Sequence, residues 1–144
     1  MRKIKWGILS TANIALTQVI PAIQRSAKAE VEAIASSNGK AEVAAAKLNI
    51  PRAYETYEEL LQDPNIDAVY IPLPNSLHRK WVLEAARHGK HVLCEKPAAL
   101  NAEEMIEMDR YCKEQNVLFM EAFMYQFHPQ HERVKEIIAS GEIG

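Results

Sequence analysis

Glu95 and Lys96 form an oppositely charged pair that directly follows the apolar run HVLC at 91–94 and precedes a proline. If the run is a buried strand, the pair projects from its carboxyl end, where open α/β folds bind their ligands. A lysine partly removed from water at such a place can act as an acid or base, or can polarise a substrate oxygen. Lys96 is therefore a candidate catalytic residue, although a surface lysine beside a turn would have the same local sequence.

The stretch GILSTANIA at 7–15 occupies the place where a nucleotide-binding fold has its phosphate loop. In the fingerprint Gly-x-Gly-x-x-Gly, glycines allow a tight turn, a close approach of the pyrophosphate and close packing of the next helix. The three glycine places here hold Ser10, Ala12 and Ala15, and the following residues open a helix whose free amides attract an anion. The candidate phosphate contacts are Ser10, Thr11, Ala12, Asn13 and Ile14. An ordinary turn between a strand and a helix is the alternative interpretation.

A second polar loop, SSNGK at 36–40, follows the second apolar run. An NAD-binding fold usually has an acidic residue about 20 residues beyond the phosphate loop, which binds the ribose 2′-hydroxyl. Ser36, Ser37, Asn38 and Lys40 include no acid, and a loop without a carboxylate does not repel a 2′-phosphate. The loop therefore favours NADP over NAD, although any polar turn has a similar composition.

The segment PLPNSLH at 72–78 joins another apolar run to a helical stretch. Pro74 lies at the strand end that faces the ligand edge and fixes the chain direction, Asn75 can cap the helix, and His78 lies one turn into it. These three residues are candidates for the same crevice. The alternatives are a purely structural His78 and an Asn75 that only caps the helix.

The segment MEAFMYQFHPQ at 120–130 is rich in aromatic side chains. Beside the crevice, such a segment could flank a flat ring such as nicotinamide. Packing of Phe123 and Phe127 between the last strand and the last helix is the alternative interpretation, and the sequence alone leaves both open.

Two kinds of segment alternate along the chain and must position these residues. Short runs of Val, Ile and Leu predict strands, and stretches with helical periodicity lie between them. Because the runs are apolar almost throughout, we expect a sheet that is covered on both faces and hence parallel. The predicted strands are 4–9, 31–36, 52–55, 68–73, 91–95 and 117–122, and the predicted helices are 13–26, 40–48, 57–62, 77–88, 102–116 and 130–140. This alternation predicts a doubly wound α/β Rossmann fold with a mostly parallel six-stranded sheet and helices on both faces.

Local signals refine the helices. Pro21 lies inside the first helical stretch, where it removes a backbone donor and should kink the helix or divide it in two. Thr56 with Glu59, and Asn101 with Glu104, are capping-box patterns at helix starts. We therefore expect an irregular first helix and well-defined starts for the third and fifth.

The bulk composition limits the possible functions. The chain has 144 residues, of which 48% are hydrophobic and 25% charged, and its net charge is −2. It has neither a basic field for nucleic acid nor a polybasic run for a membrane, and no segment approaches the roughly 18 apolar residues of a membrane span. Cys94 and Cys112 have no paired spacing, so we expect no disulfide, no metal site and a cytoplasmic location.

Four motifs, in this order, resemble one family: the glucose–fructose oxidoreductase, inositol dehydrogenase and rhizopine-catabolism (Gfo/Idh/MocA) oxidoreductases. They are KWGILSTANIA at 5–15, DAVYIPLPNSLH at 67–78, GKHVLCEKP at 89–97 and EAFMYQFHP at 121–129. The resemblance covers essentially the whole chain, and the Glu-Lys-Pro triplet is its most specific part. The chain looks closest to the branch of the dimeric dihydrodiol dehydrogenases and the NADP-dependent xylose dehydrogenases.

The resemblance implies a two-domain enzyme that uses NADP or NAD. Residues 1–122 would form the cofactor domain, and residues 123–144 would lead to a substrate domain that is absent from this chain and that makes a homo-oligomer. Lys96 would contact the nicotinamide ribose and the reacting oxygen of the substrate, and Glu95 would lie near the same ribose. Gln126 stands where this branch usually has arginine, which removes a positive charge near the cleft.

The other cofactor contacts also follow from the resemblance by position. Thr11 to Ile14 would contact the pyrophosphate, and Ser36 to Asn38 would contact the adenosine ribose. Leu73, Pro74, Asn75 and His78 would line the cofactor cleft.

The activity that the resemblance implies is hydride transfer to or from a hydroxyl carbon of a small substrate, such as a sugar, polyol or cyclic diol. Because the family's other catalytic side chains come from the second domain, we expect this chain to bind the cofactor without turnover. The alternative is a non-catalytic dinucleotide sensor of the same fold. The presence of Lys96 favours an enzyme over a sensor.

Overall fold

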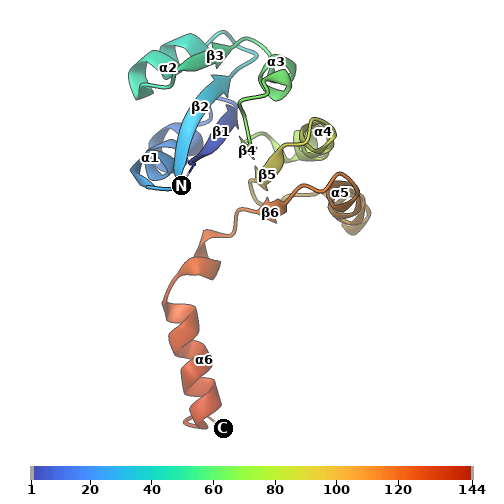
Figure 1. Ribbon diagram of the computed structural model, residues 1–144. Coiled ribbons are helices and arrows are strands. Elements are labelled where there is room, and N and C mark those ends of the chain that lie inside the picture. The colour runs from blue at the N-terminus through green and yellow to red at the C-terminus, as the bar shows by residue number, and fades with distance from the viewer. Residues whose placement is uncertain (1, 144) are drawn as a thin grey trace.

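A single six-stranded sheet forms the centre of the computed structural model, which describes residues 2–143 (Figure 1). The strands are β1 Ile4–Leu9, β2 Ala29–Ala35, β3 Arg52–Tyr54, β4 Ala68–Ile71, β5 His91–Cys94 and β6 Phe119–Glu121. All pairings between them are parallel, and the strand order is β3-β2-β1-β4-β5-β6. This order is that of a dinucleotide-binding Rossmann sheet and confirms the predicted fold.

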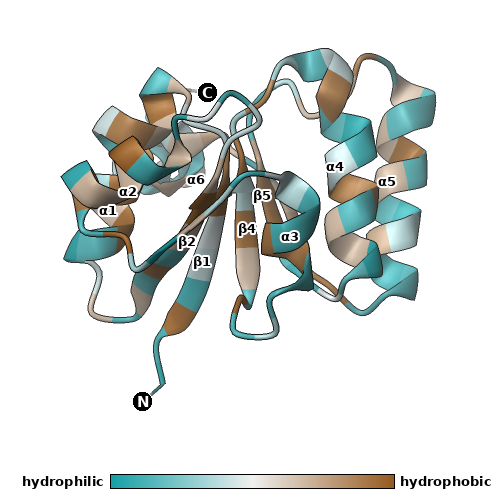
Figure 2. Ribbon diagram, turned by 90° about the horizontal axis from the view of Figure 1, so that it is seen from above, coloured by the Kyte–Doolittle hydropathy of each residue, from teal (hydrophilic) through white to brown (hydrophobic). Residues whose placement is uncertain are grey.

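The helices cover both faces of the sheet (Figure 2). Helices α1 and α2 lie on one face, and α3, α4 and α5 lie on the other. Their bounds are α1 Ile20–Arg25, α2 Ala41–Leu48, α3 Tyr57–Gln62, α4 Asn75–Arg87 and α5 Ala102–Glu114, and a 3₁₀ turn η2 Met124–Phe127 and helix α6 Gln130–Ser140 follow β6. None of the helices between residues 2 and 143 is long and apolar enough to cross a membrane.

Strand β4 shows how the core is built. Its side chains alternate between the two faces, so Val69 and Ile71 join the apolar cluster under α3, α4 and α5. Tyr70 joins the opposite cluster, which also holds Ile8 of β1 and Ala15. All four residues of β4 are buried, and the sheet is therefore covered on both sides at its centre, as its continuous apolar runs predict.

The polar loops meet because of the strand order. Strand β1 pairs with β2 on one side and with β4 on the other. The chain returns over one face after β1 and over the opposite face after β4, so the loops that follow these two strands diverge at the carboxyl edge of the sheet. Ligands of open α/β sheets bind in the crevice that such a divergence leaves.

The first helical stretch is irregular, as Pro21 predicts. A π-helical turn, η1 Ala15–Val19, precedes α1, and the backbone amide of Ile20 donates to the carbonyl oxygen of Ala15. Pro21 then lies in the first turn of α1, where a missing amide hydrogen costs least. The wider π turn thus admits the proline without ending the helix.

The predicted helix starts are confirmed at α3 and in part at α5. Thr56 Oγ1 accepts from the Glu59 amide and Glu59 Oε2 accepts from the Thr56 amide, both at 3.2 Å, which completes a capping box. Asn101 Oδ1 accepts from the Glu104 amide at 2.9 Å. The Glu104 carboxylate, however, accepts from the amide of Leu100 at 3.0 Å, one residue earlier than a capping box requires.

The expected cap at Asn75 is wrong. Helix α4 begins at Asn75, two residues earlier than the sequence predicts, and Pro74 is its N-cap. No side chain caps this helix, because the proline takes the capping position and carries no hydrogen-bonding group. Asn75 is exposed in the first turn instead, at the carboxyl edge of the sheet.

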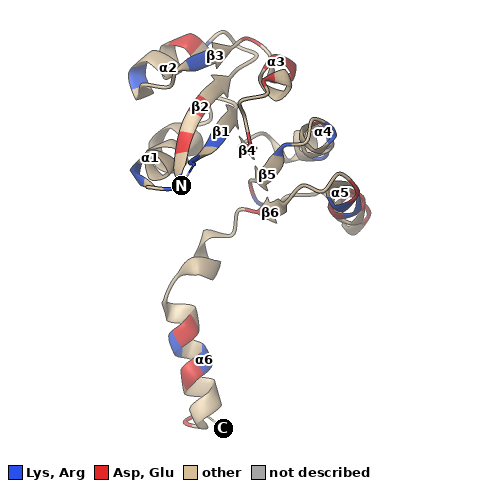
Figure 3. Cartoon of the chain, viewed as in Figure 1, with Lys and Arg blue, Asp and Glu red and all other residues tan. Residues whose placement is uncertain are grey.

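The C-terminal segment lies apart from the sheet. Figure 1 shows α6 extending away from the strands, and none of its described residues is buried. Residues of both charges lie along it (Figure 3), and two ion pairs join its own side chains, Arg133–Glu136 and Lys135–Glu132. The expected boundary between a cofactor domain ending at 122 and a connecting segment from 123 stays a prediction.

A charged network at the edge of α3 holds the connection into β4. Asp63 is buried, and its carboxylate accepts from Arg52 Nη1 at 2.6 Å, from the Tyr54 hydroxyl at 3.0 Å and from the amides of Asn65 at 2.9 Å. Burial alone would raise the pKa of Asp63, but the hydrogen bonds from Asn65, Arg52 and Tyr54 outweigh it and hold the pKa at about 2.

Replacing Asp63 by asparagine should lower the free energy of unfolding by about 2 kcal/mol at pH 7, because the shifted pKa is worth about 1.4 kcal/mol per unit. The folded-state pKa is depressed, so this stabilisation is present at neutral pH and is lost as the pH falls from about 4 to about 2. Urea unfolding of wild type and Asp63→Asn at several pH values measures the difference. Asp109→Asn, at a half-exposed aspartate of α5 that pairs with Lys113, is the matched control, and equal effects of both variants would contradict the assignment.

Candidate functional site

The candidate phosphate loop follows β1, and a serine in it adopts a backbone conformation that usually requires glycine. Ser10, at the first glycine place of the fingerprint, has a φ of 133°, a region that favours glycine. Its Oγ accepts from the amide of Ala12 at 2.9 Å, which compensates part of the strain. The loop is therefore a tight turn held by a serine side chain.

Three backbone amides at the start of the following helix lack a helical acceptor. The first bond of the helix runs from the Leu16 amide to the Ala12 carbonyl oxygen at 3.1 Å. The amides of Asn13, Ile14 and Ala15 come before it, and none has a backbone acceptor in the described chain. Asn13 and Ile14 are exposed, so this helix start offers donors to an anion at the carboxyl edge.

The second loop is tied to the first through hydroxyl groups. Ser36 is buried, its Oγ donates to Asn38 Oδ1, and the same oxygen lies 3.5 Å from Thr11 Oγ1. Asn38 Oδ1 also accepts from the amide of Lys40 at 3.3 Å. The Ser36 hydroxyl is thus used inside the protein, and the exposed groups of this loop are the side chains of Ser37, Asn38 and Lys40.

His78 connects the loop after β4 to the loop after β5. Its ring is completely buried, with Nε2 2.7 Å from the Leu73 carbonyl oxygen and Nδ1 2.9 Å from the Pro97 carbonyl oxygen. The His78 side chain therefore joins the two loops and presents no surface to a ligand. Pro74 and Asn75, in contrast, are exposed at the edge.

The charged pair after β5 is divided between two environments. Glu95 is half-buried, and its Oε1 accepts from the hydroxyl of Tyr70 at 2.6 Å, while its Oε2 accepts from the Lys96 amide at 3.2 Å. Lys96 is exposed, and its ammonium group has no hydrogen-bond or ion-pair partner among residues 2–143. The structure therefore leaves a free cation beside a fixed carboxylate.

Tyr70 is a site residue that the sequence interpretation missed. It is fully buried in β4, and burial, followed by the hydrogen bond to Glu95, raises its pKa far above the ordinary value. The available signal was a tyrosine within the aliphatic run AVYIPL, since a buried phenol needs a hydrogen-bond partner. The sequence does not say which residue that partner is.

A second glutamate holds the loop that carries Lys96. Glu121, the last residue of β6, accepts from the amide of Ala98 at 2.8 Å through Oε1. The peptide bond between Lys96 and Pro97 is cis. The hydrogen bond from Ala98 to Glu121, together with the contacts of Tyr70 and His78, holds this loop to β6, β4 and α4.

The aromatic segment lies outside this cluster. Tyr125 and Phe127 are 55% and 70% exposed, so the alternative interpretation, in which Phe127 packs between the last strand and the last helix, does not hold for the described chain. Phe123 packs against Tyr125 with ring centroids 5.5 Å apart. Gln126 is exposed on η2, and no side-chain hydrogen bond joins it to the loops at the sheet edge within residues 2–143, so its role at the cofactor stays a prediction.

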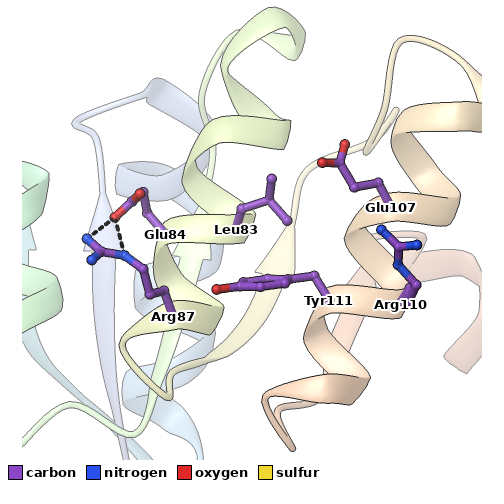
Figure 4. A pocket seen from close by; sticks show the side chains of 6 residues that line it. All are labelled: Leu83, Glu84, Arg87, Glu107, Arg110 and Tyr111. Carbon is purple, nitrogen blue, oxygen red and sulfur yellow. Dashed lines mark hydrogen bonds and ion pairs between the residues drawn. The ribbon is translucent and has the colours of Figure 1, made fainter.

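Two open grooves of the surface lie away from this edge. A groove of about 240 Å³ runs between α4 and α5, where Tyr111 lies across from Leu83 and Arg87 pairs with Glu84 (Figure 4). Another, of about 420 Å³, lies beside the first half of β2. Within residues 2–143, no group of three or more histidine, cysteine or acidic side chains is arranged to hold a metal ion. The candidate site is instead an open sheet edge.

Comparison with known proteins identifies the family. Residues 4–123 match the model of the Gfo/Idh/MocA family, described as an oxidoreductase family with an NAD-binding Rossmann fold. The chain belongs to this family. The match confirms the resemblance found in the sequence and the predicted class of cofactor, a nicotinamide dinucleotide.

Several characterised proteins are similar to this chain. D-xylose 1-dehydrogenase (NADP(+)) 2 of Haloferax volcanii is 52% identical over 140 residues, which are 96% of this chain and 42% of that protein. Trans-1,2-dihydrobenzene-1,2-diol dehydrogenase of Mus musculus is 40% identical over 98% of this chain and 43% of its own length. Both belong to the branch that the sequence motifs indicate.

The fold also matches a solved structure. A 3-ketoreductase from Actinomadura kijaniata, in complex with NADP and TDP-benzene, superposes with a TM-score of 0.93 at 36% identity, over 99% of this chain and 44% of that one. The chain thus spans less than half the length of these relatives.

Replacing His78 by leucine should lower the free energy of unfolding by about 2 kcal/mol, because both loop contacts are lost and the carbonyl group of the buried Leu73 keeps no side-chain donor. Chemical denaturation measures the change. His88→Leu, which alters a partly exposed histidine just beyond the same helix, is the control and should change stability by about 0.5 kcal/mol or less. A similar small effect of His78→Leu would show that the two loops hold without it.

Proposed function

We propose that this chain is the NADP-binding domain of an oxidoreductase that transfers hydride to or from the hydroxyl carbon of a sugar, polyol or cyclic diol. One observation carries the proposal: the open helix start at 13–15, the acid-free loop at 36–40 and the Glu95–Lys96 pair lie at one edge of the sheet. The first can hold a pyrophosphate, the second a ribose phosphate, and the third the reacting end of the cofactor and its substrate.

The preference for NADP rests on the exposed groups of the second loop. Ser37 and Asn38 can donate hydrogen bonds to a 2′-phosphate, and Lys40 can neutralise part of its charge. No carboxylate occupies positions 36–40 to bind a free 2′-hydroxyl or to repel the phosphate. The relatives from Haloferax volcanii and Actinomadura kijaniata, whose names or titles include NADP, support the same preference.

When bound, the nicotinamide accepts or supplies the hydride, and the protein positions the partners and handles the proton. In this proposal, the unpaired ammonium of Lys96 hydrogen-bonds the substrate oxygen and the nicotinamide-side ribose. Glu95 accepts from that ribose through the carboxylate lone pairs that Tyr70 and the Lys96 amide leave unused. Lys96 then stabilises negative charge on the oxygen as the carbon–hydrogen bond forms or breaks.

The other requirements of the reaction concern residues outside this chain. We propose that a second domain, which the relatives' length allows, supplies the other acid/base groups, selects the substrate and forms a homo-oligomer in the cytoplasm. A dinucleotide sensor would lack those groups. The 144-residue chain should therefore bind the cofactor and show no turnover.

Titration of the 144-residue chain with NADPH and NADH, followed by the fluorescence of Trp6 and Trp81, tests the cofactor assignment. Lys40→Glu should weaken NADPH binding about tenfold, or ~1.4 kcal/mol, and leave NADH binding nearly unchanged, because only NADPH carries the 2′-phosphate. Lys47→Glu, an exposed charge reversal in the last turn of α2, is the matched control. If the chain bound neither NADPH nor NADH, the proposed function would be contradicted.

Lys96→Ala, made in a longer protein that carries the substrate domain, should abolish most turnover and leave cofactor affinity within about tenfold. The expectation follows because the amine acts on the reacting oxygen, while the pyrophosphate is held by the first loop. Steady-state rates and NADPH titration separate the two effects. Unchanged turnover would exclude Lys96 from the chemical step.

A further inference from the structure

We propose that Tyr70 is a positioning residue of the cofactor site, which holds the Glu95 carboxylate in place and keeps it from neutralising Lys96. The inference rests on the proposed function, because it concerns how the Glu95–Lys96 pair is kept ready to bind the nicotinamide end of the cofactor. Its basis is a partly buried hydrogen bond between β4 and the residue after β5.

The first step is the position of Tyr70 in the sheet. Its ring lies in a row of neighbouring residues across the strands, with Ile8 of β1 on one side and Leu93 of β5 on the other. Glu95 lies two residues beyond Leu93, so the alternation of a strand directs its side chain to the same face as Tyr70. The ring packs in the cluster that contains Ala15, at the start of the phosphate-loop helix.

The second step concerns the hydroxyl group. Tyr70 is completely buried, and Glu95 Oε1, at 2.6 Å, is the only acceptor that it has in the described chain. The raised pKa keeps the phenol protonated at any working pH, so it remains a donor. A hydrogen bond from a buried donor to a carboxylate is among the stronger ones in proteins and restricts both side chains.

The third step concerns the neighbouring charges. Glu95 and Lys96 are adjacent in sequence, so an unrestrained glutamate side chain could reach the lysine ammonium and form an ion pair with it. Here the glutamate is turned toward Tyr70 and bonded to the Lys96 backbone amide, while the Lys96 side chain is left exposed without a partner in residues 2–143. Removing only the hydroxyl of Tyr70 would release the carboxylate and allow it to pair with Lys96.

A double-mutant cycle on NADPH affinity tests the idea in the 144-residue chain, with Tyr70→Phe, Glu95→Gln and the combined variant. Tyr70→Phe should weaken NADPH binding about fivefold in the wild-type background and have almost no effect in the Glu95→Gln background. A merely structural tyrosine would give the same effect in both backgrounds. Tyr111→Phe, the same change in the groove between α4 and α5 (Figure 4), should leave affinity unchanged.

Denaturant unfolding of each variant confirms that it is folded during the titration. If Tyr70→Phe does not fold, Glu95→Asp replaces it, because the shorter side chain keeps the charge but withdraws from the phenol; it should weaken binding by a similar factor. Additive effects in the cycle, or an unchanged affinity of Tyr70→Phe or Glu95→Asp, would overturn the role of Tyr70. Failure of the wild-type chain to bind NADPH would instead overturn the proposed function and the inference that rests on it.

Discussion

A parallel strand that is covered on both faces can present polar groups only at its ends. In this chain β4 is entirely buried, and β1 and β5 flank it in the sheet. Polar side chains that could contact a ligand therefore lie in the loops that follow these strands. All strands run the same way, and their carboxyl ends therefore share one edge. The placement of Ser10, Leu73 and Glu95 beside one another follows from this constraint, whatever ligand is bound.

Side chains that cross between loops turn this shared edge into an ordered site. The Thr11–Ser36 contact joins the loops after β1 and β2, and the Tyr70–Glu95 hydrogen bond joins β4 to the residue after β5. His78 joins the loop after β4 to the loop after β5. Each contact buries a polar group that has a partner, and no buried side-chain polar atom in residues 2–143 lacks one. These contacts restrict the motion of the loops. Less conformational entropy would then be lost when a cofactor binds.

The sequence predicts the local features well because their causes are local. The apolar runs determine the strands, Pro21 determines the irregular first helix, and Thr56 with Glu59 determines the start of α3. The contacts within the site join residues that are far apart in sequence, such as Tyr70 and Glu95, and no periodicity reports them. The same reason explains why Ser36 and His78 resemble ligand contacts in the sequence but have buried side chains in the fold.

The loop after β1 shows how the turn of a glycine fingerprint forms without glycine at its first two places. The turn still needs a positive φ, and Ser10 adopts it at a cost of about 1–3 kcal/mol that a hydrogen bond to the Ala12 amide partly offsets. That bond removes the Ala12 amide from the set of free donors. Within residues 2–143, the amides without a backbone acceptor at this helix start are those from Asn13 to Ala15. The methyl group of Ala12 stands where the fingerprint has its second glycine, so in the proposed site the helix-terminal donors would contribute more than close contact with bare backbone.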